Sequence, residues 1–298
     1  MLTKSSICSV DSVIYDLEDS VTADCKEQAR KLVANHIAGA AMQRSARKPS
    51  EVRTGGNNLD TVVIPKVQSA ADLHFVADVI QHIAPERTLF TPAAMAVTEQ
   101  PRNAPLLQPI HIIALIESAM GLANVIEICR AGQKIGLAGL AFAAEDFMAS
   151  VGLSKLPDRR EVLLARSTIV NACRAYNIPS IIDMVSVDVS QIINDTALED
   201  ESREGRSLGF TGKQAIHPSQ IDIIQRAFGP TANEVQWATQ VYVGDIEAQK
   251  QGKGSWKLNG RMIDVPVVKS AIALLDRARA CGMNVDDQVA QIKLERGV

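Results

Sequence analysis

The sequence predicts an α/β protein built as a TIM (β/α)8 barrel and followed by a C-terminal helical extension. Short apolar runs alternate along the chain with longer helical stretches, which is typical of βαβ units. The apolar runs are continuous rather than interrupted by alternating polar residues, as expected for parallel strands that are buried on both faces. A length of 298 residues also accommodates one barrel of about 250 residues together with an appendage.

Six apolar segments are expected to form strands and six stretches are expected to form helices. The expected strands are Ser12–Leu17, Thr61–Pro65, Ile110–Ile116, Gly136–Phe142, Pro179–Ile182 and Lys213–Ile216. The expected helices are Asp24–Met42, Ser69–Ile83, Ala119–Ala131, Arg159–Tyr176, Val189–Leu208 and Pro218–Phe228. Because a closed barrel has eight strands, six strands predict an incomplete barrel.

The last third of the chain has a different pattern and sets the domain boundary. We expect a barrel domain over residues 1–230 and a helical extension over residues 231–298. The extension contains a long helix at Asn233–Gln251, a short segment at Trp256–Leu258 and a last helix at Val265–Cys281. It adds no obvious strand to a barrel, so we expect it to pack on a neighbouring subunit. The breaker-rich stretches Gln43–Asn58 and Thr91–Gln108 are expected to be loops.

Composition excludes several classes of function. The net charge is −3, with acidic and basic residues interspersed, and aromatic residues make up 4% of the chain. Nucleic-acid-binding surfaces carry a basic patch, so we expect no nucleic-acid partner. No apolar run approaches the ~20 residues that span a bilayer, so we expect no membrane segment. The five cysteines form no CxxC pair, which indicates reduced thiols in an intracellular protein.

Two acidic strand ends carry most of the functional information. Glu117 follows the apolar run that ends at Ile116, and Asp146 comes four residues after the run that ends at Phe142. A lone buried charge is costly, so an acid at the end of a buried strand indicates a ligand that needs it. Two such carboxylates suit Mg²⁺, which accepts few protein ligands and keeps other positions for water and substrate. The alternative is that both are simply acids at helix N-termini.

Further candidates lie at the same predicted edge of the barrel, where TIM-barrel sites form. Asp16 and Glu18 lie at the end of the first expected strand, although a solvated acidic turn is an equally good interpretation. Lys66 ends the second strand and would pair with carboxylates or an anionic substrate if it is not a plain surface residue. His217 ends the last strand and is placed in the site wall. Asp264 precedes the last helix and has the pattern of an N-cap.

Seven motifs between about residue 11 and residue 270 carry a resemblance to a known enzyme family. They are Tyr15–Val21, Ile64–Val67, Leu115–Ala119, Ala144–Phe147, Ala165–Ser167, Gly209–Pro218 and Gly260–Pro266. In these motifs and in their order, the chain is similar to the citrate lyase beta-subunit family of the HpcH/HpaI aldolases, in its citrate lyase beta-like (citramalyl-CoA lyase-like) branch.

The resemblance implies a Mg²⁺-dependent lyase that cleaves a 3-hydroxyacyl-CoA, with the metal held by Glu117 and Asp146. Asp264 would act as general acid/base in the site of an adjacent subunit of a homotrimer. The other implied site residues fall into three groups. They are Lys66, Asp16 and Glu18 for catalysis; Arg53, Ala144, Glu145 and His217 for the acyl part of the substrate; and Gly212, Lys213, Ile216 and Pro218 for coenzyme A. The nearest eukaryotic branch is mitochondrial, which implies that location, with the transit peptide outside this chain.

Three departures from the family pattern keep other functions open. The chain starts after the family's first strand and its Pro-Gly-Ser turn, Arg53 stands in a shortened Val-Arg-x-Asn region, and Ser186 follows Asp183 where the family has a tyrosine. These features predict a truncated barrel. One alternative is therefore a catalytically impaired CoA-ester-binding or oligomerisation protein, and another is an aldolase acting on a free 2-keto acid. The acyl group stays open among citramalyl, malyl, methylmalyl and citryl.

Overall fold

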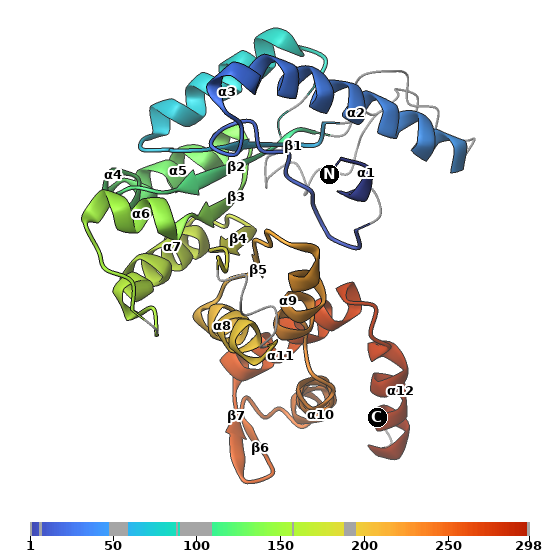
Figure 1. Cartoon of the computed structure of the whole chain (residues 1–298). Coiled ribbons are helices and arrows are strands. Elements are labelled where there is room, and N and C mark those ends of the chain that lie inside the picture. The colour runs from blue at the N-terminus through green and yellow to red at the C-terminus, as the bar shows by residue number, and fades with distance from the viewer. Residues whose placement is uncertain are drawn as a thin grey trace. The chain divides into compact units, whose positions relative to one another are not determined.

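The computed structural model describes residues 2–5, 8–47, 59–87, 89, 109–156, 158–187 and 195–296. The chain divides into two compact units, Met1–Ile221 and Asp222–Val298 (Figure 1). This division assigns most of helix α9 (Ile221–Phe228) to the C-terminal unit, whereas the sequence-based boundary after residue 230 assigns it to the barrel.

The N-terminal unit is organised around a five-stranded parallel sheet (Figure 1). Its strands lie in chain order, β1-β2-β3-β4-β5, and each pairs in parallel with the next. Their bounds are Thr61–Ile64, His111–Ile116, Leu137–Phe142, Ser180–Asp183 and Gly212–Lys213. All six residues of β3 are buried, as its continuous apolar sequence predicts. The predicted α/β class is confirmed, and because the strands are parallel, all five carboxyl ends meet at one edge.

A row of helices accompanies the sheet in the same order as the strands. The main helices are α3 (Ala70–Ile83), α5 (Val125–Ile135), α7 (Leu163–Ala175) and α8 (Asp195–Leu208). Each contacts the next, and α5, α7 and α8 also pack on the strands β3, β4 and β5 (Figure 1). Shorter segments lie between them, namely α4 (Ala119–Ala123), α6 (Ala144–Val151) and the 3₁₀ turn η3 (Arg160–Val162). Sequential strands with a sequential helix row are the arrangement of a barrel wall.

The segment before β1 differs from the prediction. Ser12–Leu17 is not a strand, and Val13 and Ile14 are 40% and 50% exposed. A strand requires a hydrogen-bonded neighbour, and no segment within the described residues supplies one for this stretch. The segment leads into the turn η1 (Ala23–Cys25) and helix α2 (Lys26–Arg47), which extends into the predicted loop Gln43–Asn58. The rest of that loop, Arg53 with it, and the predicted loop Thr91–Gln108 lie outside the described residues.

The C-terminal unit has its own small sheet and apolar core. Three helices pack against one another and around a buried cluster that includes Val235, Val241, Leu275 and Val285. The elements that follow α9 in this unit are α10 (Ala232–Lys250), β6 (Trp256–Leu258), β7 (Arg261–Ile263), α11 (Val265–Ala280) and α12 (Val285–Arg296). None of the helices in the described ranges is both long and apolar enough to cross a bilayer.

Candidate metal centre and active site

Three predicted site residues meet at the carboxyl edge of the sheet. Lys66 follows β1, Glu117 follows β2, and Asp146 lies in the first turn of α6 after β3. The Nζ atom of Lys66 is 2.8 Å from Oδ1 of Asp146 and 3.2 Å from Oε2 of Glu117. One cationic group therefore binds both carboxylates that the sequence assigned to a metal ion.

Glu117 is the anchor of this cluster. Its side chain is only 4% exposed, and its Oε1 accepts a hydrogen bond of 2.9 Å from the backbone N–H of Lys66. Lys66 has a φ of 55°, which places its backbone in the left-handed region that residues with a Cβ rarely adopt. Such strain persists where the surroundings determine the conformation, and it is concentrated at functional sites. Here it directs both donors of Lys66 at one carboxylate.

The electrostatics of the cluster suit a bound cation. The hydrogen bond to Asp146, together with those to Glu117 and Asp19, raises the pKa of the Lys66 ammonium although partial burial opposes this, so the group is fully protonated. No group of three or more His, Cys, Asp or Glu side chains within the described ranges could hold a metal ion. Two carboxylates, one buried and one 49% exposed, nevertheless match Mg²⁺, which is bound by one or two carboxylates with water and substrate completing its shell. The donor set therefore fits magnesium.

The acidic loop Asp16–Ser20 also reaches this cluster. Lys66 Nζ is 3.2 Å from Oδ2 of Asp19 and 3.9 Å from Oε1 of Glu18. The Asp16 carboxylate instead accepts hydrogen bonds within the loop, from the N–H of Glu18 at 2.7 Å and from the N–H and hydroxyl of Ser20. Partial burial opposes the effect, but these hydrogen bonds lower the pKa of the Asp16 carboxyl. The contacts assign Asp16 to shaping the turn, and a catalytic role for it stays a prediction.

A close backbone contact fixes the position of the turn that carries Lys66. Gly121 in α4 approaches the Val67 carbonyl so closely that a Cβ on Gly121 would lie 2.5 Å from that oxygen. We expect Gly121→Ala to lower the free energy of unfolding by about 2 kcal/mol, because this overpacking exceeds the gain in helix propensity. Urea unfolding followed by circular dichroism measures the change. Gly254→Ala is the control, since a Cβ at Gly254 meets nothing within 4 Å, and an equal loss there would contradict this prediction.

Several other predicted residues do not face the Lys66 cluster. The Glu145 carboxylate pairs with Lys155 at 2.9 Å, and Ala144 begins α6 with a buried side chain. The strand predicted at Lys213–Ile216 is present, but its predicted bounds are wrong, because β5 covers Gly212–Lys213. His217 consequently does not end a strand. It precedes the 3₁₀ turn η5 (Pro218–Gln220), where its Nδ1 accepts a hydrogen bond from the Ser219 N–H.

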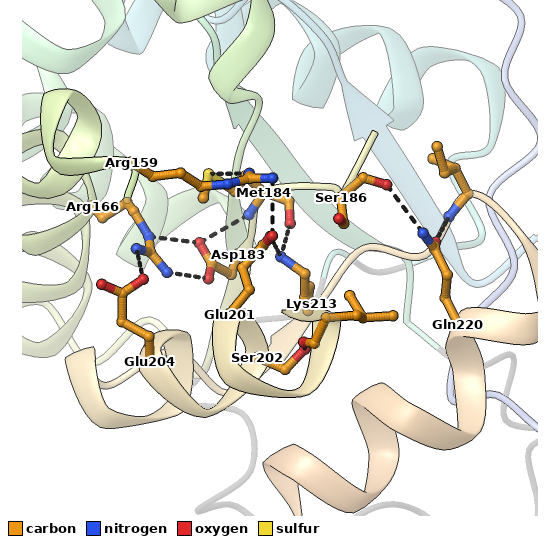
Figure 2. Close-up of polar contacts among 12 residues, drawn as sticks. Arg159, Arg166, Asp183, Met184, Ser186, Glu201, Ser202, Glu204, Lys213 and Gln220 are labelled. Atoms are coloured by element: carbon orange, nitrogen blue, oxygen red, sulfur yellow. Dashed lines mark hydrogen bonds and ion pairs between the residues drawn. The ribbon is translucent and has the colours of Figure 1, made fainter. Parts of the chain in front are cut away.

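Lys213 belongs to a buried ion-pair network (Figure 2). Its side chain is 0% exposed, and its Nζ contacts the Met184 carbonyl at 2.6 Å and the Glu201 carboxylate at 2.5 Å. Glu201 also pairs with Arg159 at 2.9 Å. This ammonium is therefore not presented to a ligand, and a coenzyme A contact by Lys213 would have to use its backbone. The coenzyme A roles of Gly212, Ile216 and Pro218 stay predictions.

A second ion pair closes the end of β4 (Figure 2). The Arg166 guanidinium and the Asp183 carboxylate are both 0% exposed and form a two-pronged contact at 3.1 and 2.7 Å. Arg166 also donates to Glu204 at 2.8 Å, and its guanidinium carbon lies 5.7 Å from the centre of the Phe210 ring. Arg166 stands in one of the family motifs, but its partners were not predicted from the sequence. The contribution of Glu204 was not predicted either, because spacing within one helix does not show which residue of a neighbouring helix it contacts.

Asp264 lies in the C-terminal unit at the start of α11. Its carboxylate accepts a hydrogen bond of 3.2 Å from the Val267 N–H, which confirms the N-cap predicted from the sequence. The side chain is partly exposed and has exposed Met262 and Val265 nearby in the chain. Its function as an acid/base in an adjacent subunit stays a prediction.

Comparisons with known proteins agree with this geometry. Residues 1–218 match the family model described as HpcH/HpaI aldolase/citrate lyase. Human mitochondrial citramalyl-CoA lyase is 30% identical over 284 residues, which cover 88% of this chain and 77% of the relative. Citrate lyase subunit beta of Escherichia coli K12 is 31% identical over 296 residues, which cover 95% of this chain and 90% of the relative.

A solved structure extends the likeness to the fold. CitE of Mycobacterium tuberculosis, crystallised with magnesium, acetoacetate and coenzyme A, superposes with a TM-score of 0.65 at 27% identity. The match covers 93% of this chain and 92% of CitE. The structural neighbours are TIM-barrel-type proteins, which confirms the predicted fold class. The motifs, the parallel sheet and these matches establish that the chain belongs to the HpcH/HpaI aldolase/citrate lyase family.

Proposed function

We propose that this protein is a Mg²⁺-dependent carbon–carbon lyase that cleaves a 3-hydroxyacyl-CoA to acetyl-CoA and a 2-keto acid. The main observation behind it is the pair Glu117, directly after β2, and Asp146, in the first turn of α6 after β3, which contact the same cationic group at 3.2 and 2.8 Å. Family membership, relatives named as lyases and a neighbour crystallised with magnesium and coenzyme A support the proposal. Citramalyl-CoA, malyl-CoA and citryl-CoA are the candidate substrates.

Metal binding and proton transfer would be carried out by different residues of this chain. Glu117 and Asp146 would supply the protein oxygens of the metal site, with Glu117 kept in place by the Lys66 N–H. Bound there, Mg²⁺ would act as a Lewis acid toward the hydroxyl and carboxylate oxygens of the substrate. Cleavage also requires a group that removes the hydroxyl proton and returns a proton to the thioester enolate carbon. Asp264 of an adjacent subunit is our candidate for this acid/base, which makes the homotrimer part of the proposal.

The direct test offers all three CoA esters to the purified full-length chain, with Mg²⁺ and with excess chelator. We expect acetyl-CoA release from one ester, reduced at least about 100-fold by chelation, because the metal contributes several kcal/mol of transition-state stabilisation. Cleavage that persists undiminished in chelator would overturn the metal-dependent mechanism. A mitochondrial location is a separate prediction, which fractionation of the source cells checks.

One observation favours a second candidate function. Ser12–Leu17 lies outside the sheet with Val13 and Ile14 exposed, as expected if the barrel of an isolated chain is incomplete. A non-catalytic CoA-ester-binding protein would bind one of the three esters with no acetyl-CoA release under any metal condition. Release of acetyl-CoA excludes this alternative.

A further inference from the structure

Lys66 is shared by two separate pairs of acids. On one side its ammonium contacts Glu117 and Asp146, the proposed metal ligands, at 3.2 and 2.8 Å. On the other side it contacts Asp19 and Glu18 of the acidic loop at 3.2 and 3.9 Å. Four carboxylates thus surround one lysine, and the cluster carries a formal charge of −3 without a metal ion.

The ammonium and a metal ion require the same two carboxylates. Nζ contacts Oε2 of Glu117 and Oδ1 of Asp146, which belong to the two side chains that would hold a divalent cation. Two positive groups close to the same oxygens repel each other strongly, particularly where water is partly excluded. Glu117 is almost completely buried, so it requires a positive partner at all times. The lysine must therefore give up these oxygens when a metal ion takes them.

The acidic loop is held in place independently of Lys66. Asp16 bonds the N–H groups of Glu18 and Ser20, and the Lys26 ammonium donates to the carbonyls of Leu17 and Glu18 at 3.0 and 2.5 Å. These bonds fix the loop backbone without using the carboxylates of Glu18 or Asp19. The two carboxylates consequently stay within reach of Lys66 whether or not it contacts the metal ligands.

We propose that Glu18 and Asp19 form a holding site for the Lys66 ammonium, which moves onto them and releases Glu117 and Asp146 when a divalent cation binds. The inference rests on the proposed magnesium site and goes beyond it, because it assigns a function to acids that do not ligate the metal. Lys66 is thereby a positioning residue that keeps the two ligands together and competes with the metal. The acidic loop weakens that competition.

Calorimetric titration of the full-length chain with Mg²⁺ tests this directly, with no substrate present. We expect Lys66→Met to lower the Mg²⁺ dissociation constant about tenfold, because a competing positive charge is removed. We expect the double variant E18Q/D19N to raise it about tenfold, because the lysine then stays on the metal ligands. In the Lys66→Met background, E18Q/D19N is expected to change the Mg²⁺ dissociation constant less than about twofold. The difference between the two backgrounds is the coupling between Lys66 and the two acids, which a double-mutant cycle measures.

The controls separate this coupling from general charge effects. Lys31→Met and Glu27→Gln remove one exposed charge of each sign from an i,i+4 pair on α2 and are expected to leave Mg²⁺ affinity unchanged. Titrations at about 1 M salt, where the screening length is about 3 Å, suppress long-range contributions. Lys66→Gln replaces Lys66→Met if circular dichroism shows that the methionine variant does not fold.

Each outcome has a distinct meaning. If E18Q/D19N changes the Mg²⁺ dissociation constant equally with and without Lys66, these acids act on the metal directly. That result would contradict the proposed holding site. Weaker Mg²⁺ binding by Lys66→Met would overturn it as well, while leaving the metal site itself intact. Absence of Mg²⁺ binding by the unmodified chain would remove both the metal site and this inference.

Discussion

Glu117→Gln is expected to lower kcat/KM for CoA-ester cleavage by about 1,000-fold, which corresponds to about 4 kcal/mol of transition-state stabilisation. Glutamine keeps the size of the side chain and an acceptor for the Lys66 N–H, so the fold around β2 is retained. It removes the negative charge that the proposed metal site requires. It also turns an amide group toward Lys66 Nζ, where a carboxylate oxygen now lies at 3.2 Å. The measurement is steady-state kinetics at saturating Mg²⁺.

The matched control is Glu127→Gln, an exposed acid in the first turn of α5, the main helix that follows β2. We expect the kcat/KM of this variant to stay within about twofold of that of the unmodified chain, because substitutions of exposed residues away from the core and the active site have small effects. Nearly full activity of the Glu117→Gln variant would contradict the assignment of Glu117 as a metal ligand, on which the proposed function rests. Excess Mg²⁺ is not expected to restore the activity of Glu117→Gln, because the variant lacks a ligand for the metal and not the metal itself.

Sequence reasoning was most successful where one local pattern suffices. The strands from β1 to β4 and the helices α3, α7 and α10 follow from apolar runs and helical periodicity, and their observed bounds are close to the predicted ones. The placement of Glu117 and Asp146 at one edge follows from the rule that parallel strands share a carboxyl edge. Neither inference requires knowledge of side-chain contacts.

The failures have physical causes. Ser12–Leu17 has a strand-like sequence, but strand formation depends on a neighbour, which a single segment cannot report. The buried ion pair of Lys213 was not predicted, because its partner Glu201 lies on a different element and the motif around Lys213 says nothing about it. One missed element did have a signal. Asn259 and Gly260, both with positive φ, form the two-residue turn of the β6–β7 hairpin, and Asn-Gly is the typical sequence of such turns.

Asp183→Asn is expected to lower the free energy of unfolding by about 3–5 kcal/mol, which is the usual cost of breaking a buried ion pair on one side. Asp183 accepts two hydrogen bonds from Arg166 and one of 2.9 Å from the Met184 N–H, and neither charged side chain is exposed. Asparagine would leave the guanidinium without its fully buried partner and would direct an amide donor at another donor. Urea unfolding of the full chain, followed by circular dichroism, gives the loss directly.

Glu204→Gln provides the comparison, because Glu204 binds the same guanidinium at 2.8 Å but is 46% exposed. Water compensates for the loss of an exposed partner, so we expect a decrease of about 1 kcal/mol or less. The two losses in unfolding free energy are directly comparable, because each substitution removes one negatively charged partner of Arg166. Equal effects would mean that the buried contact at the end of β4 adds nothing beyond an ordinary surface ion pair. A much larger effect of Asp183→Asn would identify this contact as the clamp that holds α7 against the carboxyl end of β4.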